Sequence, residues 1–337
     1  MIKRIDSLDI LKAFAIFMVV WGHVIQHCLS TAYYEEPVYK IIYSFHMPLF
    51  MILAGFFSHN SLKLPIRELA LKKIKELIVP CITWGGVIYS LFVIFNLITR
   101  NANLFSFIGF AKVLVNDYWF LKSLFICYLI AWFTLKLKYS WLIVVSLLVS
   151  QLLNVYNIPI MYPCFIVGFY LRMVIDRLQF IKYSIFYLLF FLPLLFYAFC
   201  RKNFFDIATE SNLINNGTLV SILNLFQHRI VKIIMGVSGS LFLISIMRRY
   251  YWQVSEKDNP IIHFICKIGR KSLGIYLVHT LLVSSIMAKI VKFDNINPLL
   301  FNAIISPLIS IVIIMVCMMV ILVLEKNKVV RFFFLGH

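Results

Sequence analysis

The sequence has 337 residues, of which 62% are hydrophobic and 14% charged, and its formal net charge is +18 at pH 7. A mean hydropathy of +0.92 is too high for a water-soluble globular protein of this length, which excludes soluble enzymes and soluble binding domains. We therefore expect a membrane protein whose positive charge anchors it beside anionic lipid, and no nucleic-acid partner.

About ten apolar segments are close to the roughly 20 residues that a helix needs to cross a bilayer. In chain order, the predicted spans are 9–29, 40–58, 77–98, 118–135, 139–155, 160–175, 183–200, 226–246, 272–291 and 299–324. The segments between them are short, so we expect one all-α transmembrane helical bundle that forms a single domain over residues 1–337. Because Lys12 and His23 interrupt the first segment, and no small-residue cleavage pattern follows it, we expect a retained helix rather than a signal peptide.

The distribution of basic residues predicts the orientation. With both termini in the cytoplasm, most of the 32 Lys and Arg residues fall in cytoplasmic segments, as the positive-inside rule requires. The longest external segment, 201–225, either caps an outward-facing site or is an ordinary polar connector.

The first span carries the most chemical information. Asp9, Lys12, His23, Gln26 and His27 form one polar stripe, and ionisable side chains in hydrocarbon cost at least about 2–3 kcal/mol, so they usually line a functional cavity. Lys12 and His23 are about three turns apart on nearly the same face, separated by about 16 Å along the helix axis.

This spacing suits a long, thin donor such as coenzyme A. Lys12, at the cytoplasmic end, would bind a phosphate or the pantetheine arm. His23, deeper in the membrane, would accept a proton from an attacking hydroxyl as a general base. The alternative is that His23 only ties helices together by hydrogen bonds.

The second span places a histidine at a similar depth. It contains Phe45-His46-Met47-Pro48, and Pro48 predicts a kink that frees a carbonyl group toward His46. We expect His46 to share a catalytic site with His23; the alternative is a kink that only packs against its neighbours.

Later polar residues allow two interpretations each. Trp119 is either an interfacial belt residue or a surface on which a sugar ring stacks. Arg229 and Lys232, like Lys122, lie in the outer half of their spans and would bind an oxyanion or a lipid-linked pyrophosphate, or reach the outer headgroups, which suits Lys122 better. Arg270 and Lys271 precede the ninth span and suit either nucleotide phosphates or cytoplasmic anchoring.

The seven cysteines are scattered without CxxC or metal-ligand spacing. We expect them to be small buried hydrophobic residues, with no disulfide, no metal site and no bound cofactor.

Taken together, these motifs resemble acyltransferase family 3, a family of integral membrane acyltransferases that modify surface glycans. Five blocks carry the resemblance in order along most of the chain: Leu8-Asp9-Ile-Leu-Lys12 with Trp21-Gly22-His23, Phe45-His46-Met-Pro48-Leu-Phe50 through Gly55-Phe56, Trp119-Phe120-Leu121, Phe165-Ile-Val-Gly168-Phe-Tyr-Leu-Arg172, and Ser272-Leu-Gly274-Ile-Tyr276-Leu-Val-His279. Lys12 stands where the family usually has Arg, which keeps the charge but loses the planar, bidentate guanidinium.

The resemblance implies an O-acyltransferase of a bacterial inner membrane that moves an acyl group, acetyl above all, from cytoplasmic acyl-CoA to a glycan or lipid-linked glycan. It implies His23 as catalytic base, with Lys12 and His46 as required site residues. Asp9, Trp119, Arg229, Lys232, Arg270 and Lys271 are the further candidates for contacts with the substrates. Succinyl transfer is an alternative within the family, and a transporter or flippase of a glycan intermediate is the alternative from another class.

Overall fold

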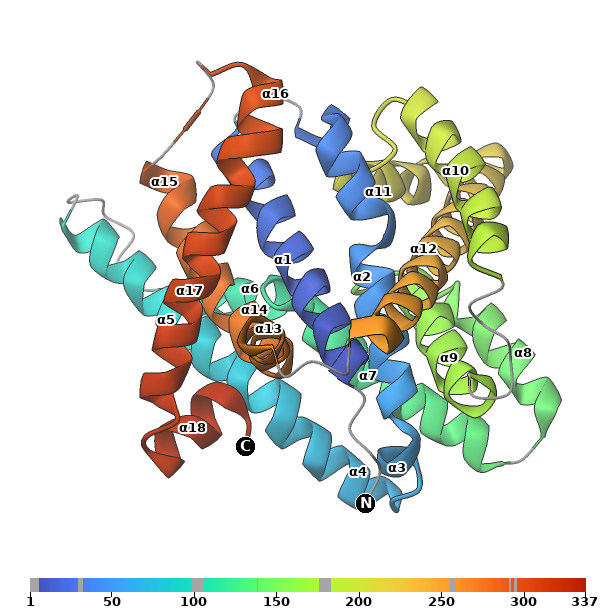
Figure 1. Ribbon diagram of the computed structural model, residues 1–337, viewed down its shortest axis with the longest axis horizontal. Helices are drawn as coiled ribbons and strands as arrows, with labels where there is room; N and C mark the ends of the chain where they lie inside the picture. Colours follow the sequence, from blue (N-terminus) through green and yellow to red (C-terminus); the bar gives the residue numbers. More distant parts are fainter. Residues whose placement is uncertain are drawn as a thin grey trace.

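The computed structural model describes residues 6–29, 33–98, 106–137, 139–175, 183–254, 259–290, 292–293 and 296–337. These residues are largely helical and include no strand, which confirms the predicted all-α bundle (Figure 1). The longer helices are α1 (Asp6–Cys28), α2 (Pro37–Phe57), α5 (Val79–Ile98), α7 (Trp119–Lys136), α8 (Ser140–Ser150), α9 (Ile158–Val174), α10 (Ser184–Cys200), α12 (Leu219–Val254), α14 (Ser272–Thr280) and α17 (Ser306–Leu324).

Shorter elements connect or extend these helices. They are η1 (Tyr33–Glu35), α3 (His59–Leu62), α4 (Ile66–Lys73), η2 (Ile74–Ile78), α6 (Phe107–Asn116), α11 (Ile207–Asn216), α13 (Pro260–Arg270), η4 (Leu281–Met287), α15 (Ala288–Ile290), α16 (Pro298–Leu300), η5 (Phe301–Ile305) and α18 (Lys328–Leu335).

The apolar helices match the predicted spans. Within the described ranges, six helices are long and apolar enough to cross a membrane, and four shorter apolar helices accompany them. Each corresponds to one predicted span. The helix whose ends differ most from the prediction is α12, which has 36 residues where the sequence predicts a span over 226–246, and α8 is shorter than predicted, with 11 residues where the sequence predicts 139–155.

The first two helices lie at the centre of the bundle (Figure 1). Of their most apolar stretches, 67% in α1 and 72% in α2 is buried inside the protein, against 33% to 39% for the other four long spans. On the polar stripe of α1, Asp9 is buried, and the other members, Lys12, His23, Gln26 and His27, are part-buried.

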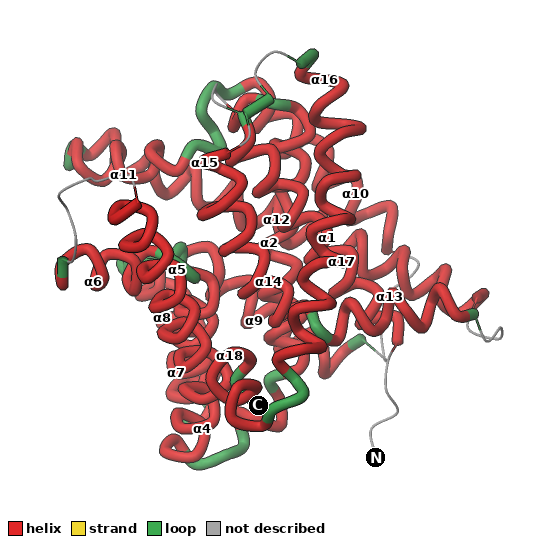
Figure 2. The backbone as a smooth tube through the Cα atoms, turned by 90° about the vertical axis from the view of Figure 1, so that its left-hand side faces the viewer, coloured by secondary structure: helices red, strands yellow, loops and turns green. Residues whose placement is uncertain are grey.

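The two ends of the bundle carry different short helices. In both views α4 and α18 lie at one end and α16 lies at the other, with α11 toward the same end as α16 (Figures 1 and 2). The assignment of the α4 and α18 end to the cytoplasm stays a prediction, made from the distribution of Lys and Arg.

Small residues allow α2 and α9 to pack backbone against backbone. A methyl group added at Gly55 would overlap the carbonyl oxygen of Phe165, and one added at Gly168 would overlap that of Ile52. Such close approach through small residues is typical of helix pairs in membranes, where packing replaces the hydrophobic effect as the driving force. It fixes the position of the helix that carries His46.

This packing predicts a large stability difference between two identical substitutions. Gly168→Ala forces α2 and α9 apart and should lower the free energy of unfolding by about 1–3 kcal/mol, the usual cost of overpacking. Gly86→Ala on α5, where an added methyl group meets nothing within 4 Å, is the matched control and should be neutral or stabilising. Thermal unfolding of the two variants in detergent tests this, and equal melting temperatures would contradict it.

Candidate functional site

The polar stripe of α1 turns toward α2 and α14. His23 and His27 are one turn apart and stack with ring centroids 5.7 Å apart. One turn of α2 reaches the same region, where the hydroxyl of Tyr43 donates a hydrogen bond of 2.9 Å to Oε1 of Gln26. Gly22 permits this approach, because an added methyl group there would meet the Tyr43 ring at 2.8 Å.

His46 lies beside Tyr43 on α2. Its Nδ1 lies 2.7 Å from the carbonyl oxygen of Ile42, and its ring is 4.5 Å from the Tyr43 ring. His46 also lies close enough to His23 for the two rings to interact electrostatically. The structure thus brings the two histidines that we predict to share a site into one region.

A further histidine, on α14, completes this group. The ring of His279 packs edge to face against that of His23, with centroids 5.2 Å apart and planes at 75°, and its side chain is fully buried. We call His23, His27, His46 and His279 the histidine cluster. Sequence reasoning did not select His279 as a site residue, although an ionisable residue inside the ninth span is the same signal that selected His23.

An apolar cavity of about 130 Å³ adjoins the histidine cluster. Its walls come from α1, α2, α7 and α14, and they include Lys12, Phe50, Phe57, Phe120, Leu273 and Tyr276. One contact connects it to the cluster, because the ring of Tyr276 in its wall lies 5.5 Å from that of His279. Met47, also in its wall, is the residue after His46 in the chain.

The other end of the cavity is polar. Lys12 lines it with Ser272, the first residue of α14. Nζ of Lys12 lies 3.3 Å from Oδ1 of Asp9, and it also lies over the Phe57 ring at 4.1 Å. A quarter of the Lys12 side chain remains exposed. Its charge is therefore available to a ligand that enters here.

Helix α13 brings two more cations to this end. A methyl group at Gly269 would overlap the carbonyl oxygen of Asp9, so α13 packs directly against the start of α1. Arg270, which follows, is exposed, whereas Lys271 forms an ion pair with Glu325 beyond α17.

Trp119 does not line the cavity but supports its wall. It packs at 6.1 Å against Phe120, whose ring in turn lies 5.8 Å from Tyr276. The neighbouring Tyr118 donates a hydrogen bond of 3.1 Å to the carbonyl oxygen of Leu277, which joins α7 to α14.

Lys122, one turn further along α7, donates to the carbonyl oxygens of Leu114 and Val115, at the end of α6, and to that of Asp117.

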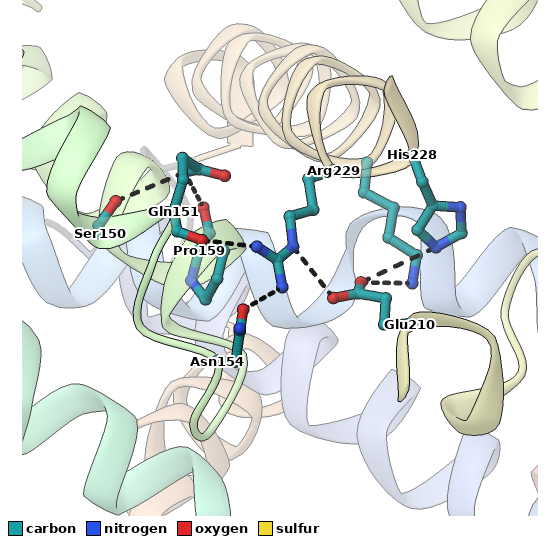
Figure 3. Close-up of polar contacts among 8 residues, drawn as sticks. Ser150, Gln151, Asn154, Pro159, Glu210, His228 and Arg229 are labelled. Carbon is teal, nitrogen blue, oxygen red and sulfur yellow. Dashed lines mark hydrogen bonds and ion pairs between the residues drawn. The ribbon is translucent and has the colours of Figure 1, made fainter. Parts of the chain in front are cut away.

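Arg229 and Lys232 belong to a second group, which we call the Glu210 cluster and which also contains His228. Arg229 donates to the carbonyl oxygen of Gln151 and to Oδ1 of Asn154, each at 2.7 Å, and lies 3.3 Å from Glu210 (Figure 3). Lys232 lies 3.3 Å from the same carboxylate. These bonds hold α11 and the turn between α8 and α9 against α12.

Segment 201–225 is therefore docked on the bundle by its helix α11. A second tether lies at the start of α2, where Glu35 accepts hydrogen bonds from the backbone N–H of Asn203 at 2.5 Å and from Lys40 at 2.7 Å. The two predicted cations of α12 thus make a structural clamp, and their contact with a substrate stays a prediction.

The clamp predicts a pH-dependent release of α11. Burial alone raises the pKa of Glu210, but Lys232 and Arg229 outweigh it and hold the pKa below its ordinary value of 4.5. The carboxylate therefore stabilises docking fully above about pH 4.5, and this contribution is lost as the pH falls through the lowered pKa. Protease cleavage within α11 should rise over that acidic range in the wild type. Glu210→Gln should raise cleavage at neutral pH and remove most of the pH dependence, and an unchanged cleavage rate would contradict the clamp.

Comparison with known proteins gives a family and two relatives. Residues 5–324 match a family described as an acyltransferase domain. The chain is 27% identical over 188 residues to the nodulation protein NolL of Sinorhizobium fredii, a match that covers 52% of this chain and 50% of that protein. It is 28% identical over 130 residues to NolL of Mesorhizobium japonicum, covering 37% and 34%. The chain thus spans about half the length, or less, of the curated relatives that it matches. No solved structure shows significant similarity to it.

Proposed function

Because the chain belongs to this acyltransferase family, we propose that it is a membrane O-acyltransferase that moves an acetyl group from acetyl-CoA to a hydroxyl of a surface polysaccharide or lipid-linked glycan. The observation that carries the proposal is the apolar cavity that Lys12 lines and whose wall residue Tyr276 packs against His279 of the histidine cluster. A bacterial inner membrane, with the Lys12 end in the cytoplasm, is the location that fits a cytoplasmic donor.

In this proposal the donor would enter the cavity in one direction. The phosphates of coenzyme A would bind at the cationic end, near Lys12, Arg270 and Lys271, while the thin pantetheine arm would lie along the apolar walls. The distance of about 16 Å that α1 spans between Lys12 and His23 is of the same order as the length of this arm. The thioester would then lie beside the histidine cluster.

The reaction needs one proton acceptor beside the thioester end of the pantetheine arm. The oxygen of the acceptor hydroxyl attacks the thioester carbonyl carbon as His23 takes its proton; the C–O bond forms and the C–S bond breaks. The proton then passes to the departing sulfur, so that coenzyme A leaves as the thiol. His46, on the neighbouring helix α2, would orient His23 or the acceptor. Trp119, Arg229 and Lys232 stay candidate contacts of the glycan.

A labelled donor tests this function. Inside-out membrane vesicles from cells that express the chain receive acetyl-CoA or succinyl-CoA labelled in the acyl group, and the vesicles supply their own glycans. We expect alkali-labile label from acetyl-CoA in the glycan fraction. Label from succinyl-CoA alone would show that the transferred group is succinyl and not acetyl. Label from neither donor, with altered glycan export from the cells, would favour a flippase.

A further inference from the structure

His279 is fully buried inside the protein, beside His23. It lies on α14, one turn beyond the cavity residue Tyr276, and its ring packs edge to face against that of His23 at 5.2 Å. A buried polar ring without hydrogen bonds on both sides costs stability, so its persistence calls for a reason.

The hydrogen bonds of His279 fix its tautomer. Nδ1 lies 3.0 Å from the carbonyl oxygen of Ile275, and a carbonyl oxygen can only accept, so Nδ1 carries the hydrogen. Nε2 of the neutral ring is then a lone-pair acceptor. It is buried and has no hydrogen-bond partner among the described residues.

His23 also has a ring nitrogen without a hydrogen-bond partner among the described residues. This atom, Nδ1, is buried as well. When a histidine takes up a proton, both ring nitrogens become donors. For Nε2 of His23 to accept a proton, Nδ1 must already carry the hydrogen of the neutral ring, and this N–H group becomes a stronger donor once the ring is charged. The Nε2 atom of His279 is a ring nitrogen of the same cluster that has no donor among the described residues.

The backbone after His279 is also unusual. One residue beyond α14, the helix widens into the π-helical segment η4 (Leu281–Met287). Such segments are rare and occur frequently at functional sites. This places a local change of helix geometry directly beside the histidine pair.

We propose that His279 is a positioning residue that accepts the Nδ1–H of protonated His23 at its own Nε2, directly or through one water. This inference rests on the proposed acyl transfer and adds a residue to it. As the acceptor hydroxyl gives its proton to Nε2 of His23, the C–O bond forms and the C–S bond breaks. His279 stabilises the imidazolium until the proton passes to the sulfur of coenzyme A.

Two substitutions separate this role from packing. His279→Gln keeps a hydrogen-bond acceptor, whereas His279→Leu removes it and leaves an apolar side chain. We expect kcat of the Leu variant to fall by about 10² and that of the Gln variant to stay within about tenfold of wild type. The KM for acetyl-CoA should not change in either variant, because the side chain at position 279 does not contact the donor phosphates.

The measurement is transfer of label from acetyl-CoA in inside-out vesicles at several donor concentrations, with rates normalised to the amount of chain in the membrane. Thr280→Ala, one residue along α14, is the control for local disturbance of the helix. If His279 only fills space, the Leu variant will be at least as active as the Gln variant, which would overturn the inference and leave the acyl transfer standing. If the wild type transfers no label from any donor, the proposed function fails and this inference fails with it.

Discussion

His23→Gln is expected to lower the turnover of acyl transfer by about 10² to 10⁴, which is the usual contribution of a general base. Glutamine has a similar volume and remains polar, but it cannot take up a proton from the attacking hydroxyl. The His23 ring packs against His27 and His279, and Nδ1 makes no hydrogen bond with the described residues, so the substitution should leave the fold intact. The rate of label transfer from acetyl-CoA in vesicles measures the effect.

The matched control is His263→Gln, a histidine exposed on α13 and outside the histidine cluster. Its rate should stay within about twofold of wild type, since surface substitutions rarely change function or stability by much. A His23→Gln variant that is present at the wild-type level and turns over at the wild-type rate would remove His23 from the chemistry.

Lys12→Met is expected to raise the KM for acetyl-CoA by about 10- to 100-fold, with a smaller change in kcat. A hydrogen bond to a charged group contributes about 1.5–3 kcal/mol, and this one would bind the donor equally before and during the reaction. Lys12→Arg should restore most of the affinity, because it keeps the charge at the mouth of the cavity.

Asp9 complicates the single substitution, because it is buried and loses its ion pair with Lys12. The double variant Asp9→Asn with Lys12→Met removes both charges and is the control for this cost. It should recover membrane levels while the KM stays high. A wild-type KM in the double variant would show that Lys12 does not bind the donor.

Hydropathy predicts the spans of this chain well because each crosses a solvent that tolerates few polar residues. The predicted 77–98 and 183–200 differ from α5 and α10 by at most two residues at either end. Hydropathy does not predict α11, α13 and α18, which lie between or after the spans. Their positions depend on tertiary contacts, such as the hydrogen bond of 2.9 Å from Trp84 to the carbonyl oxygen of Phe334.

Within the site, the helical period of α1 is sufficient to place Lys12 and His23 on one face. The partners of that face come from distant parts of the chain and have no local signal: His279 lies far along the sequence and meets His23 only because α14 packs against α1. Arg229 shows the converse. A cation within a span suggests a substrate contact, but its actual partners, Glu210 and Asn154, lie in connecting segments that no helical period relates to it.

The most direct test of the central claim is mass spectrometry of surface glycans from cells that express the wild type or His23→Gln at matched membrane levels. The account predicts an acetyl-sized mass increment on a sugar with the wild type and its loss with the variant. An identical glycan mass profile in both cells and in cells without the chain would contradict it.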